Sequence, residues 1–379
     1  HTRFKCDWSS DVCSSDLRGV HTRNKVTGEE EDFYAPVTVN ACGIWGSPIA
    51  DLASVHVGMY PAKGALLVFA HRVNNRVINR CRKPSNADIL VPGYTVCIIG
   101  TTSTRIPFEE CDNVAVTPDE VTLLITEGAK MAPVLSSTRI LRAYAGVRPL
   151  VSADNDPTGR NISRGIVCLD HETRDGVSGL VTITGGKLMT YRLMAEIATD
   201  AVCRKLGVDK QCETATTPLP GSEEKSYESV AQQIWENPSM AQKAAAARMG
   251  TSASRIMTDN RLDERLVCEC EEVSVSEVNN AIERLDASTL TDLRRRTRIG
   301  MGTCQANFCA LRSASVFARV GRDEGAKDSL GQMKEFLQGR WKGIRPVLLG
   351  RTIRETEMTR ALYELSFNVN GHRIGGDKE

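Results

Sequence analysis

The clearest pattern of apolar and polar positions lies between Val181 and Val202. A β-rich run at Val181–Ile183 meets the pair Gly185-Gly186, and apolar residues then recur at helical spacing as far as Val202. This pattern predicts a strand, a tight turn and a helix. Glycines at such a junction let a ligand approach the backbone, and the first amides of the helix stabilise an electron-rich group placed above them. A cofactor site and an ordinary glycine-rich turn of an α/β protein both fit these residues.

A second strand–glycine–helix junction lies earlier in the chain. The β-branched run 35–42 ends at Gly43, and residues 47–53 have helical character. The two junctions are compatible with one sheet whose turns face a nucleotide, although the earlier one alone fits a buried strand and a surface helix equally well. Lys187 stands in the first turn of the later helix, where its charge opposes the helix dipole, which indicates another use for it.

The segment between residues 60 and 150 has the pattern of an antiparallel sheet. Proline and glycine separate short β-rich runs at residues 65–69, 76–79, 95–101 and 139–144. Thr117-Pro118-Asp119-Glu120 combines an N-cap, a first-turn proline and an acidic third residue, which predicts a helix to about Lys130. Among the basic residues here, Arg148 is the candidate for an anionic substrate, because a guanidinium can hold a phosphate or carboxylate through two hydrogen bonds.

The sheet pattern is replaced by helical patterns after Gly207. The polar, proline-containing stretch 208–224 predicts a linker, and residues 227–235, 240–249 and 329–338 predict helices. Two further helix starts are indicated by capping boxes, Ser274 with Glu277 and Thr289 with Asp292.

Four cysteines follow the pattern C-x-C-x33-C-x4-C, at Cys268, Cys270, Cys304 and Cys309. Residues 304–320 are helix-forming, so Cys309 is expected one turn along a helix that begins at Cys304. Four thiolates that converge on one point require a cation. The tight first pair and the wide second pair favour a [2Fe–2S] cluster over structural zinc, whose pairs are usually spaced C-x2–4-C; unliganded thiols are the third interpretation.

Composition excludes several classes of function. The chain of 379 residues is long enough for two or three domains, and 48 Lys and Arg against 47 Asp and Glu leave a net charge of +1, which gives no general affinity for nucleic acid. The short run Arg294–Arg296 with Arg298 is better explained as a surface that offsets an anionic cluster or docks a redox partner. No apolar run approaches the length of a membrane span. Thirteen cysteines without a secretory signal indicate a reducing compartment.

Two segments are set aside. The first 17 residues repeat Ser-Ser-Asp and have no apolar core of a signal peptide, so we interpret residues 1–17 as a non-native segment. Gly300-Met301-Gly302 has Gln305 where a dinucleotide fingerprint has glycine, and it follows no predicted strand, so it is not a Rossmann signal.

From about residue 26 to its C-terminus the chain resembles the catalytic chains of bacterial anaerobic glycerol-3-phosphate dehydrogenases. The matching stretches are VNACGIWG, NRCRKPSNADILVPG, RILRAYAGVRPL, ITGGKLMTYRLMAE, LVCEC and DLRRRTRIGMGTCQANFC. The resemblance implies a fold of the α/β and α+β classes. It combines an incomplete Rossmann-like FAD-binding domain, an antiparallel substrate domain as in D-amino-acid oxidase, and a small helical [2Fe–2S] domain like bacterioferritin-associated ferredoxin.

The same resemblance suggests where the domains begin and end. The FAD-binding domain is expected in residues 18–59 and 151–207, the substrate domain in 60–150, a linker with helices in 208–260, the [2Fe–2S] domain in 261–322 and a helical extension in 323–379. The family's N-terminal βαβ unit with its glycine fingerprint has no counterpart here, so the chain is expected to be truncated.

The activity implied by the resemblance is oxidation of sn-glycerol 3-phosphate to dihydroxyacetone phosphate. FAD and a [2Fe–2S] cluster are the implied cofactors, and partner subunits are implied to pass electrons to menaquinone, with the protein cytoplasmic and peripheral on the inner face of the cell membrane. Two alternatives stay open: another FAD-linked dehydrogenase acting on an amine or amino acid, and a non-catalytic [2Fe–2S] electron-transfer fragment.

The resemblance also assigns roles to residues. Arg148 and Lys187 match positions associated with the substrate phosphate and the reacting centre. The cluster ligands are Cys268, Cys270, Cys304 and Cys309, and the residues expected to contact FAD are Gly43, Gly185, Gly186, Leu188, Met189 and Thr190. Lys63-Gly64-Ala65 is followed by Leu66, where aerobic relatives carry histidine, so the resemblance does not identify the general base.

Overall fold

The computed structural model describes residues 4–7, 16–24, 28–151, 165–219, 227–257, 264–320 and 329–367. The chain forms two compact units. The first comprises His1–Gly64, Thr102–Val114 and Ala145–Thr217, and the second comprises Ala65–Thr101, Ala115–Tyr144 and Pro218–Glu379. Of the segment interpreted as non-native, Phe4–Asp7 forms strand β1 and residues 16–17 are described, while the remainder lies outside the described residues.

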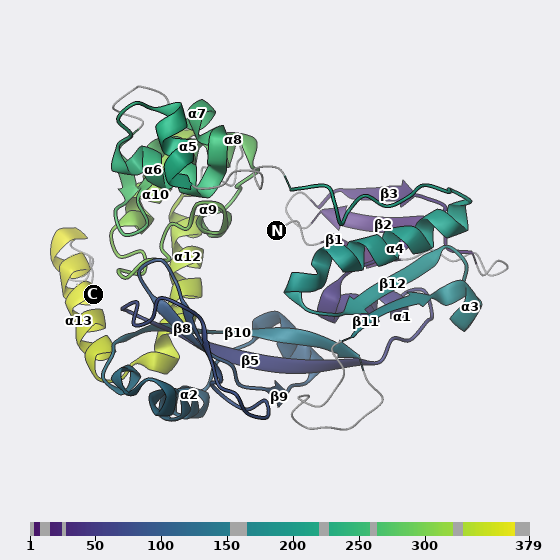
Figure 1. Cartoon of the computed structure of the whole chain (residues 1–379), viewed down its shortest axis with the longest axis horizontal. Coiled ribbons are helices and arrows are strands. Elements are labelled where there is room, and N and C mark those ends of the chain that lie inside the picture. Colours follow the sequence, from purple (N-terminus) through teal and green to yellow (C-terminus); the bar gives the residue numbers. More distant parts are fainter. Residues whose placement is uncertain are drawn as a thin grey trace, which may run out of the picture. The chain divides into compact units, whose positions relative to one another are not determined.

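The first unit contains a three-stranded sheet in the order β11-β12-β4 (Figure 1). Its strands are β4 (Thr38–Asn40), β11 (Ile166–Asp170) and β12 (Leu180–Gly185). Strand β12 pairs antiparallel with β11 and parallel with β4, with Leu180 opposite Thr38. Helix α4 (Tyr191–Leu206) packs on β11 and β12 and ends at Gly207, which has a left-handed backbone.

Both predicted strand–glycine–helix junctions therefore lie on adjacent parallel strands of one sheet. Strand β4 leads into the 3₁₀ turn η1 (Gly43–Trp45) and helix α1 (Gly46–Asp51), and β12 leads into η4 (Leu188–Thr190) and α4. Because the carboxyl ends of neighbouring parallel strands meet at the same edge, the two turns are brought together. Helix α3 (His171–Asp175) follows β11, and its buried His171 ring contacts Thr182 Oγ1 at 2.7 Å and Asp175 at 2.6 Å.

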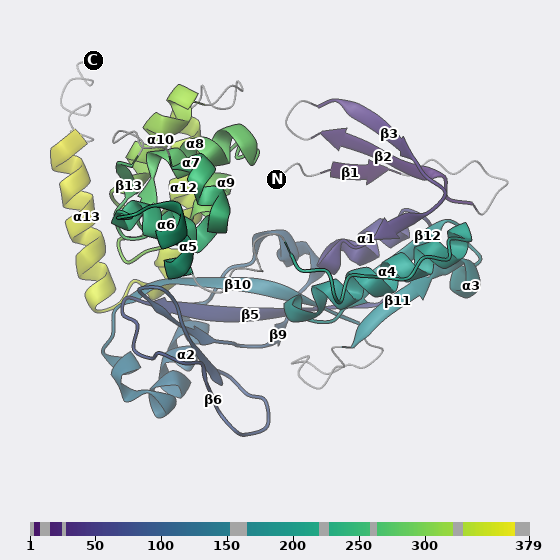
Figure 2. The same ribbon diagram turned by 45° about the horizontal axis from the view of Figure 1, so that its top comes forward.

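A separate antiparallel sheet in this unit has the order β1-β2-β3 (Figure 2). Its other strands are β2 (Gly19–Asn24) and β3 (Glu30–Tyr34). Gly19 pairs with Tyr34 and Arg23 with Glu30, so the register is continuous along the two strands.

The antiparallel sheet predicted between residues 60 and 150 is confirmed, in the order β10-β5-β8-β7-β6 with β9 beside β5. Its strands are β5 (Met59–Phe69), β6 (Ile78–Asn79), β7 (Ile89–Pro92), β8 (Cys97–Gly100), β9 (Thr104–Arg105) and β10 (Ile140–Val151). The structure extends the outer predicted runs, because β5 begins at Met59 and β10 continues to Val151. This extension places Arg148 within a strand.

Helix α2 (Pro118–Met131) covers part of this sheet and begins at the predicted capping box, where Thr117 and Glu120 bond each other's backbone N–H groups. Gly128 allows the close approach of α2 to β8, since a Cβ atom there would lie 2.5 Å from Ile99 Cδ1. The short 3₁₀ helices η2 (Phe108–Asn113) and η3 (Pro133–Ser136) flank α2 in sequence.

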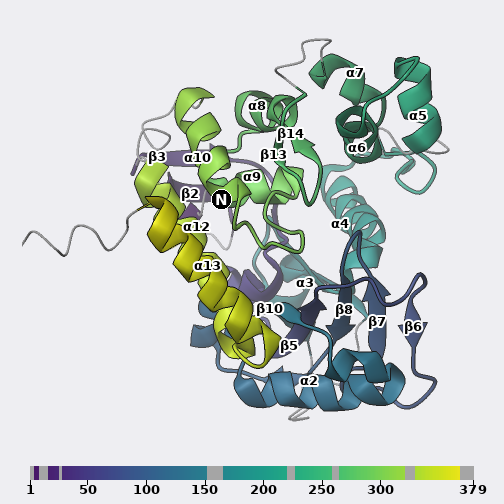
Figure 3. The ribbon, with the colours of Figure 1, turned by 90° about the vertical axis from the view of Figure 1, so that its left-hand side faces the viewer.

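The rest of the second unit is helical (Figure 3). Its helices are α5 (Tyr227–Ile234), α6 (Met240–Met249), α7 (Ala253–Ile256), α8 (Val275–Arg284), α9 (Leu290–Thr297), α10 (Cys309–Val320), α12 (Ser329–Ile344) and α13 (Arg351–Phe367), with 3₁₀ turns η5 (Gly250–Ser252) and η6 (Arg345–Val347). A small hairpin, β13 (Leu266–Cys268) and β14 (Val273–Ser274), precedes α8. Both predicted capping residues of this region, Ser274 and Thr289, cap their helices.

The predicted helix from Cys304 to Val320 is wrong at its start, because α10 begins at Cys309. Gln305 and Ala306 have φ angles of +52° and +73°, in the left-handed region that interrupts a right-handed helix. Cys304 therefore stands in an irregular loop. No helix among the described residues is both long and apolar enough to cross a membrane.

Candidate functional site

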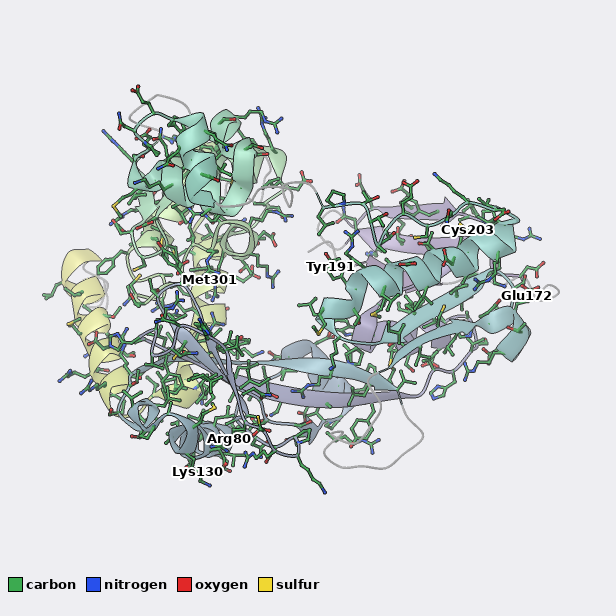
Figure 4. The ribbon with its side chains drawn as sticks, in the orientation of Figure 1. Arg80, Lys130, Glu172, Tyr191, Cys203 and Met301 are labelled. Atoms are coloured by element: carbon green, nitrogen blue, oxygen red, sulfur yellow. The ribbon has the colours of Figure 1, made fainter. Side chains whose placement is uncertain are left out.

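A cavity of about 920 Å³ opens in the first unit, where the two glycine junctions meet. Gly43 comes from the first junction, Gly185 to Leu188 from the second, and residues 147–150 from β10. One face of α4 forms a further wall, beginning with Tyr191, which Figure 4 labels at the start of that helix. Six predicted site residues line this one cavity: Gly43, Arg148, Gly185, Gly186, Lys187 and Leu188.

The glycines at this cavity serve different purposes. Gly185 and Gly186 have φ angles of +74° and +63°, and a Cβ on Gly186 would lie 2.7 Å from Met194 Sδ and 2.9 Å from Thr190 Oγ1. These two positions need glycine for the turn itself. Gly43 has a φ of +58°, but nothing lies within 4 Å of where its Cβ would stand, so a side chain there would project into open space at the cavity wall.

The turn after β12 is fixed by hydrogen bonds of its own. The Lys187 N–H donates to Thr190 Oγ1 at 3.0 Å, and the Thr190 hydroxyl donates to the Lys187 carbonyl at 2.8 Å. The turn presents two large apolar side chains to solvent, since Leu188 is 91% and Met189 81% exposed. Met189 and Thr190, predicted to contact a flavin ring, belong to this turn but are not among the residues that line the cavity.

Arg148 is held at the cavity wall by backbone carbonyl groups. Its guanidinium donates to the carbonyl oxygens of Ala62 at 3.4 Å, Lys63 at 3.3 Å and Thr102 at 3.2 Å. Gly64 makes room for it, because a Cβ at this position would overlap the guanidinium group. The half-buried Arg148 thus has a fixed position, and a fixed cation at a cavity wall is suited to an anionic ligand.

The α4 face of this cavity was not predicted as part of a site. Met194, Ala195, Ala198 and Val202 line the cavity at helical spacing. The same spacing is typical of a helix face packed in a core, so the sequence alone does not distinguish a ligand-facing helix from a buried one.

The four predicted cysteines are brought together in the second unit. Cys268 ends β13, Cys270 lies in the following turn, and Cys304 and Cys309 flank the left-handed residues before α10. Their thiols form a continuous series in which Cys309 bonds both Cys268 and Cys304, and Cys304 also bonds Cys270. Cys268 and Cys309 are each 1% exposed and belong to the hydrophobic core of this region.

Backbone N–H groups surround these sulfurs. Those of Glu271 and Gly300 donate to Cys268, and those of Ala306 and Phe308 donate to Cys304. The Thr303 hydroxyl lies 3.8 Å from Cys270 Sγ. The left-handed backbone at 305–306 thus curls the loop around the Cys304 sulfur, which accounts for the interrupted helix.

Hydrogen bonding divides the four thiols by acidity. The pKa of Cys304 is lowered to about 5 and that of Cys268 to about 7, in each case chiefly by the hydrogen bond from the Cys309 thiol. Its bonds to these two sulfurs raise the pKa of Cys309, and burial raises the pKa of Cys270. The N–H donors and the lowered pKa values favour thiolates, which are the ligands of zinc and iron–sulfur centres.

The chemistry of this donor set fits an iron–sulfur cluster, which is held by four cysteine thiolates and tuned by hydrogen bonds to sulfur. Within the described ranges, no three or more His, Cys, Asp or Glu side chains stand in a geometry that would hold one metal ion. The paired glycines Gly300 and Gly302 belong to this loop. A Cβ on Gly302 would overlap Cys270 Cβ, so the Gly-Met-Gly segment that carries no dinucleotide signal is needed for close packing of the cysteine loops.

Family models match both regions. A model described as FAD dependent oxidoreductase matches residues 11–192, which include all the lining of the first cavity up to Tyr191. A model described as BFD-like [2Fe-2S] binding domain matches residues 266–319, which include all four cysteines.

Curated relatives match nearly the whole chain. The A chain of the anaerobic glycerol-3-phosphate dehydrogenase of Haemophilus influenzae is 53% identical over 352 residues, covering 93% of this chain and 62% of the relative. The protein of the same name from Escherichia coli strain K12 is 54% identical, covering 91% of this chain and 64% of the relative. The chain thus spans a little over three fifths of the length of these relatives.

A solved structure shares the fold. The glycerol-3-phosphate dehydrogenase of Bacillus halodurans, solved in complex with FAD, matches with a TM-score of 0.68 at 18% identity, covering 92% of this chain and 70% of that chain. The implied mixture of an FAD-dependent oxidoreductase fold and a small C-terminal [2Fe–2S] domain is thereby confirmed as the fold class.

Proposed function

Because the chain belongs to the family of these anaerobic glycerol-3-phosphate dehydrogenase chains, we propose that it is the part of such an enzyme that oxidises sn-glycerol 3-phosphate to dihydroxyacetone phosphate. The observation that carries this proposal is the cavity of about 920 Å³ in which two glycine junctions and a fixed arginine meet. FAD and a [2Fe–2S] cluster are the cofactors of the two matched family models.

The cavity residues suit an FAD-dependent oxidation. FAD, when bound, supplies a two-electron acceptor for the substrate carbon. Gly43, Gly185, Gly186 and Leu188 would hold its ring system, with Met189 and Thr190 in the same turn. Arg148 would bind the phosphate of the substrate and orient its carbon chain, and Lys187 would place a positive charge beside the reacting centre.

The cysteine loops suit the second half of the function. A [2Fe–2S] cluster carries one electron at a time, which lets a two-electron oxidation feed a one-electron chain. We assign Cys268, Cys270, Cys304 and Cys309 as its ligands within a cluster domain of residues 261–322. The other assignments are an FAD-binding domain in 18–59 and 151–207, a substrate domain in 60–150, a linker with helices in 208–260 and a helical extension in 323–379. Residues 1–17 stay outside these domains, as the non-native segment.

The curated relatives are each named as one subunit of a larger enzyme, so the proposal includes partner subunits. They would take electrons from the cluster and deliver them to menaquinone, which places the protein in the cytoplasm at the inner face of the cell membrane. The proposal includes no nucleic-acid partner, because the net charge of the chain is +1.

A spectrum of the anaerobically purified chain tests the proposal. Flavin absorption together with about two irons and two sulfides per chain is expected. Adding sn-glycerol 3-phosphate should bleach the flavin bands, whereas glycine or another amino acid should not. Bleaching by an amino acid and not by glycerol 3-phosphate would transfer the assignment to an amine or amino-acid dehydrogenase. Iron without flavin at saturating FAD would leave only an electron-transfer fragment, and zinc in place of iron would contradict the cluster.

A matched pair of alanine substitutions tests the position of FAD. Gly43 and Gly207 both have left-handed backbones, with φ of +58° and +66°, and both have nothing within 4 Å of an added Cβ. Each Gly→Ala change should cost a similar ~1–2 kcal/mol of folding free energy. Only Gly43 lines the cavity, so G43A should weaken FAD binding about tenfold or more by intruding on the ligand, while G207A should not.

The measurement is a fluorescence titration with FAD, together with the thermal midpoint of each variant. Equal FAD affinity in G43A and the wild-type chain would show that the ring system is not placed against Gly43.

A further inference from the structure

A second, strongly basic cavity of about 600 Å³ lies among the helices of the second unit. Five arginines contribute to its lining: Arg248, Arg255, Arg284, Arg296 and Arg298. Four of them stand in the last turns of α6, α7, α8 and α9, and Arg298 is the residue at which α9 ends. Figure 3 shows α6, α7 and α8 in this helical region. The remaining lining includes the apolar side chains of Met249, Ile256 and Leu285.

The positive charge of this cavity is only partly neutralised. Arg248 bonds the fully buried Glu277 carboxylate at 2.7 and 2.9 Å, and Arg298 bonds Glu271, which is 3% exposed, at 2.7 Å. Arg255, Arg284 and Arg296 are exposed, and none of the three has a carboxylate partner within the part of the chain that the structure describes. Two carboxylates thus face five guanidinium groups, in a chain whose net charge is only +1.

Helix stabilisation does not explain this arrangement. A basic residue in the last turn of a helix interacts favourably with the helix dipole, and this accounts for one arginine on each helix. It does not account for several helix ends that bring their arginines to one cavity. Like charges gathered in this way repel one another, a cost that an anionic ligand would remove.

The basic cavity adjoins the cysteine loops. Arg298 bonds Glu271, the residue that follows Cys270. Two residues after Arg298, the Gly300 N–H donates to the Cys268 sulfur. A molecule bound by these arginines would therefore lie beside the segments that carry two of the four proposed cluster ligands.

We propose that this cavity docks a carboxylate-rich segment of the protein that accepts electrons from the cluster. This inference rests on the proposed function, because it assumes electron transfer from the cluster to a partner. Arginine pairs with carboxylates through two parallel hydrogen bonds. The basic side chains are spread over several helix ends, which suits a segment with several carboxylates better than one small anion. The apolar lining residues add contact area for a peptide, and opposite charges accelerate association and orient the partner.

Charge reversal at the arginines without a carboxylate partner tests the proposal. The cluster-containing chain is titrated with a fluorescent poly-L-glutamate peptide, and separately with inorganic phosphate and with vesicles containing phosphatidylglycerol. The triple variant R255E/R284E/R296E should bind the peptide about 100-fold more weakly than the wild-type chain. The control variant K243E/R319E/K334E makes the same change in net charge at exposed residues that do not line the cavity, and it should bind nearly as the wild type does. Raising salt from about 50 mM to about 500 mM should abolish the difference between the two variants.

Each other outcome contradicts the proposal. Equal loss of peptide binding in both triple variants would show general charge attraction. Phosphate that binds in place of the peptide would assign the site to a small oxyanion, and binding to vesicles without binding to the peptide would assign it to a membrane surface. Iron content and flavin bleaching are measured on the same samples. If they fail while peptide binding behaves as expected, the proposed function fails and the basic cavity remains a docking site for acidic segments.

Discussion

Replacing Cys304 by serine is expected to reduce the iron content from about two to near zero per chain. Cys304 is central to the series of sulfurs, since it bonds both Cys309 and Cys270 and accepts N–H groups from Ala306 and Phe308. Its pKa is lowered to about 5, so it is the thiol most readily available as a thiolate. A serine hydroxyl at this position stays protonated at neutral pH and replaces a soft ligand by a hard one.

The consequence for electron transfer separates the two proposed steps. In the FAD-containing enzyme, C304S should leave bleaching of the flavin by sn-glycerol 3-phosphate within about twofold of wild type, because that step takes place among other residues. Transfer onward to the partner subunits should fall about 100-fold or more, because the one-electron carrier is lost. Equal loss of both rates would argue against this division.

A matched substitution controls for the loss of a thiol alone. Cys203 lies on α4 in the first unit and is partly exposed, like Cys304 (Figure 4). C203S removes a thiol without touching the cysteine loops, so iron content and both rates should stay unchanged. Loss of iron in C203S would show that the chain responds to thiol removal in general.

The sequence predicted the two glycine junctions because their local signals are strong. The change from a β-rich run to helical spacing at Gly185-Gly186 reports a period that the backbone itself imposes. The α2 capping box at Thr117 and Glu120 is local in the same sense. That both junctions share a sheet follows from the pairing of Thr38 with Leu180, which no local pattern specifies.

The start of α10 was mispredicted for a tertiary reason. Residues 305–308 are good helix formers, but N–H groups among them bond the Cys304 sulfur in place of continuing a helix. The basic cavity was also beyond local patterns, since Arg248 and Arg298 are 50 positions apart in the sequence. The run around Arg296 did indicate a docking surface, and the structure adds Arg255 and Arg284 to it from other helices.

Replacing Arg148 by lysine is expected to raise the half-saturating concentration of sn-glycerol 3-phosphate in flavin bleaching about 30- to 100-fold. Lysine keeps the charge but not the planar fork, so it cannot bond the carbonyls of Ala62, Lys63 and Thr102 and hold a phosphate in a fixed place as well. Buried carbonyl groups that lose their donors should also lower the free energy of unfolding, by about 1–3 kcal/mol.

A structural role alone would produce only the second effect, and Arg192 supplies the control that distinguishes them. Its guanidinium also donates to backbone carbonyls, those of Thr214 and Thr217, but Arg192 does not line the cavity. R192K should therefore lower the unfolding midpoint in a similar way while leaving the response to substrate unchanged. The preference for glycerol 3-phosphate over glycerol gives a second readout, since glycerol has no phosphate for Arg148 to bind. If R148K keeps that preference and only its unfolding midpoint falls, Arg148 joins β10 to β5 and the substrate phosphate is bound elsewhere; if the preference collapses in R148K and persists in R192K, the fixed guanidinium is the phosphate-binding group.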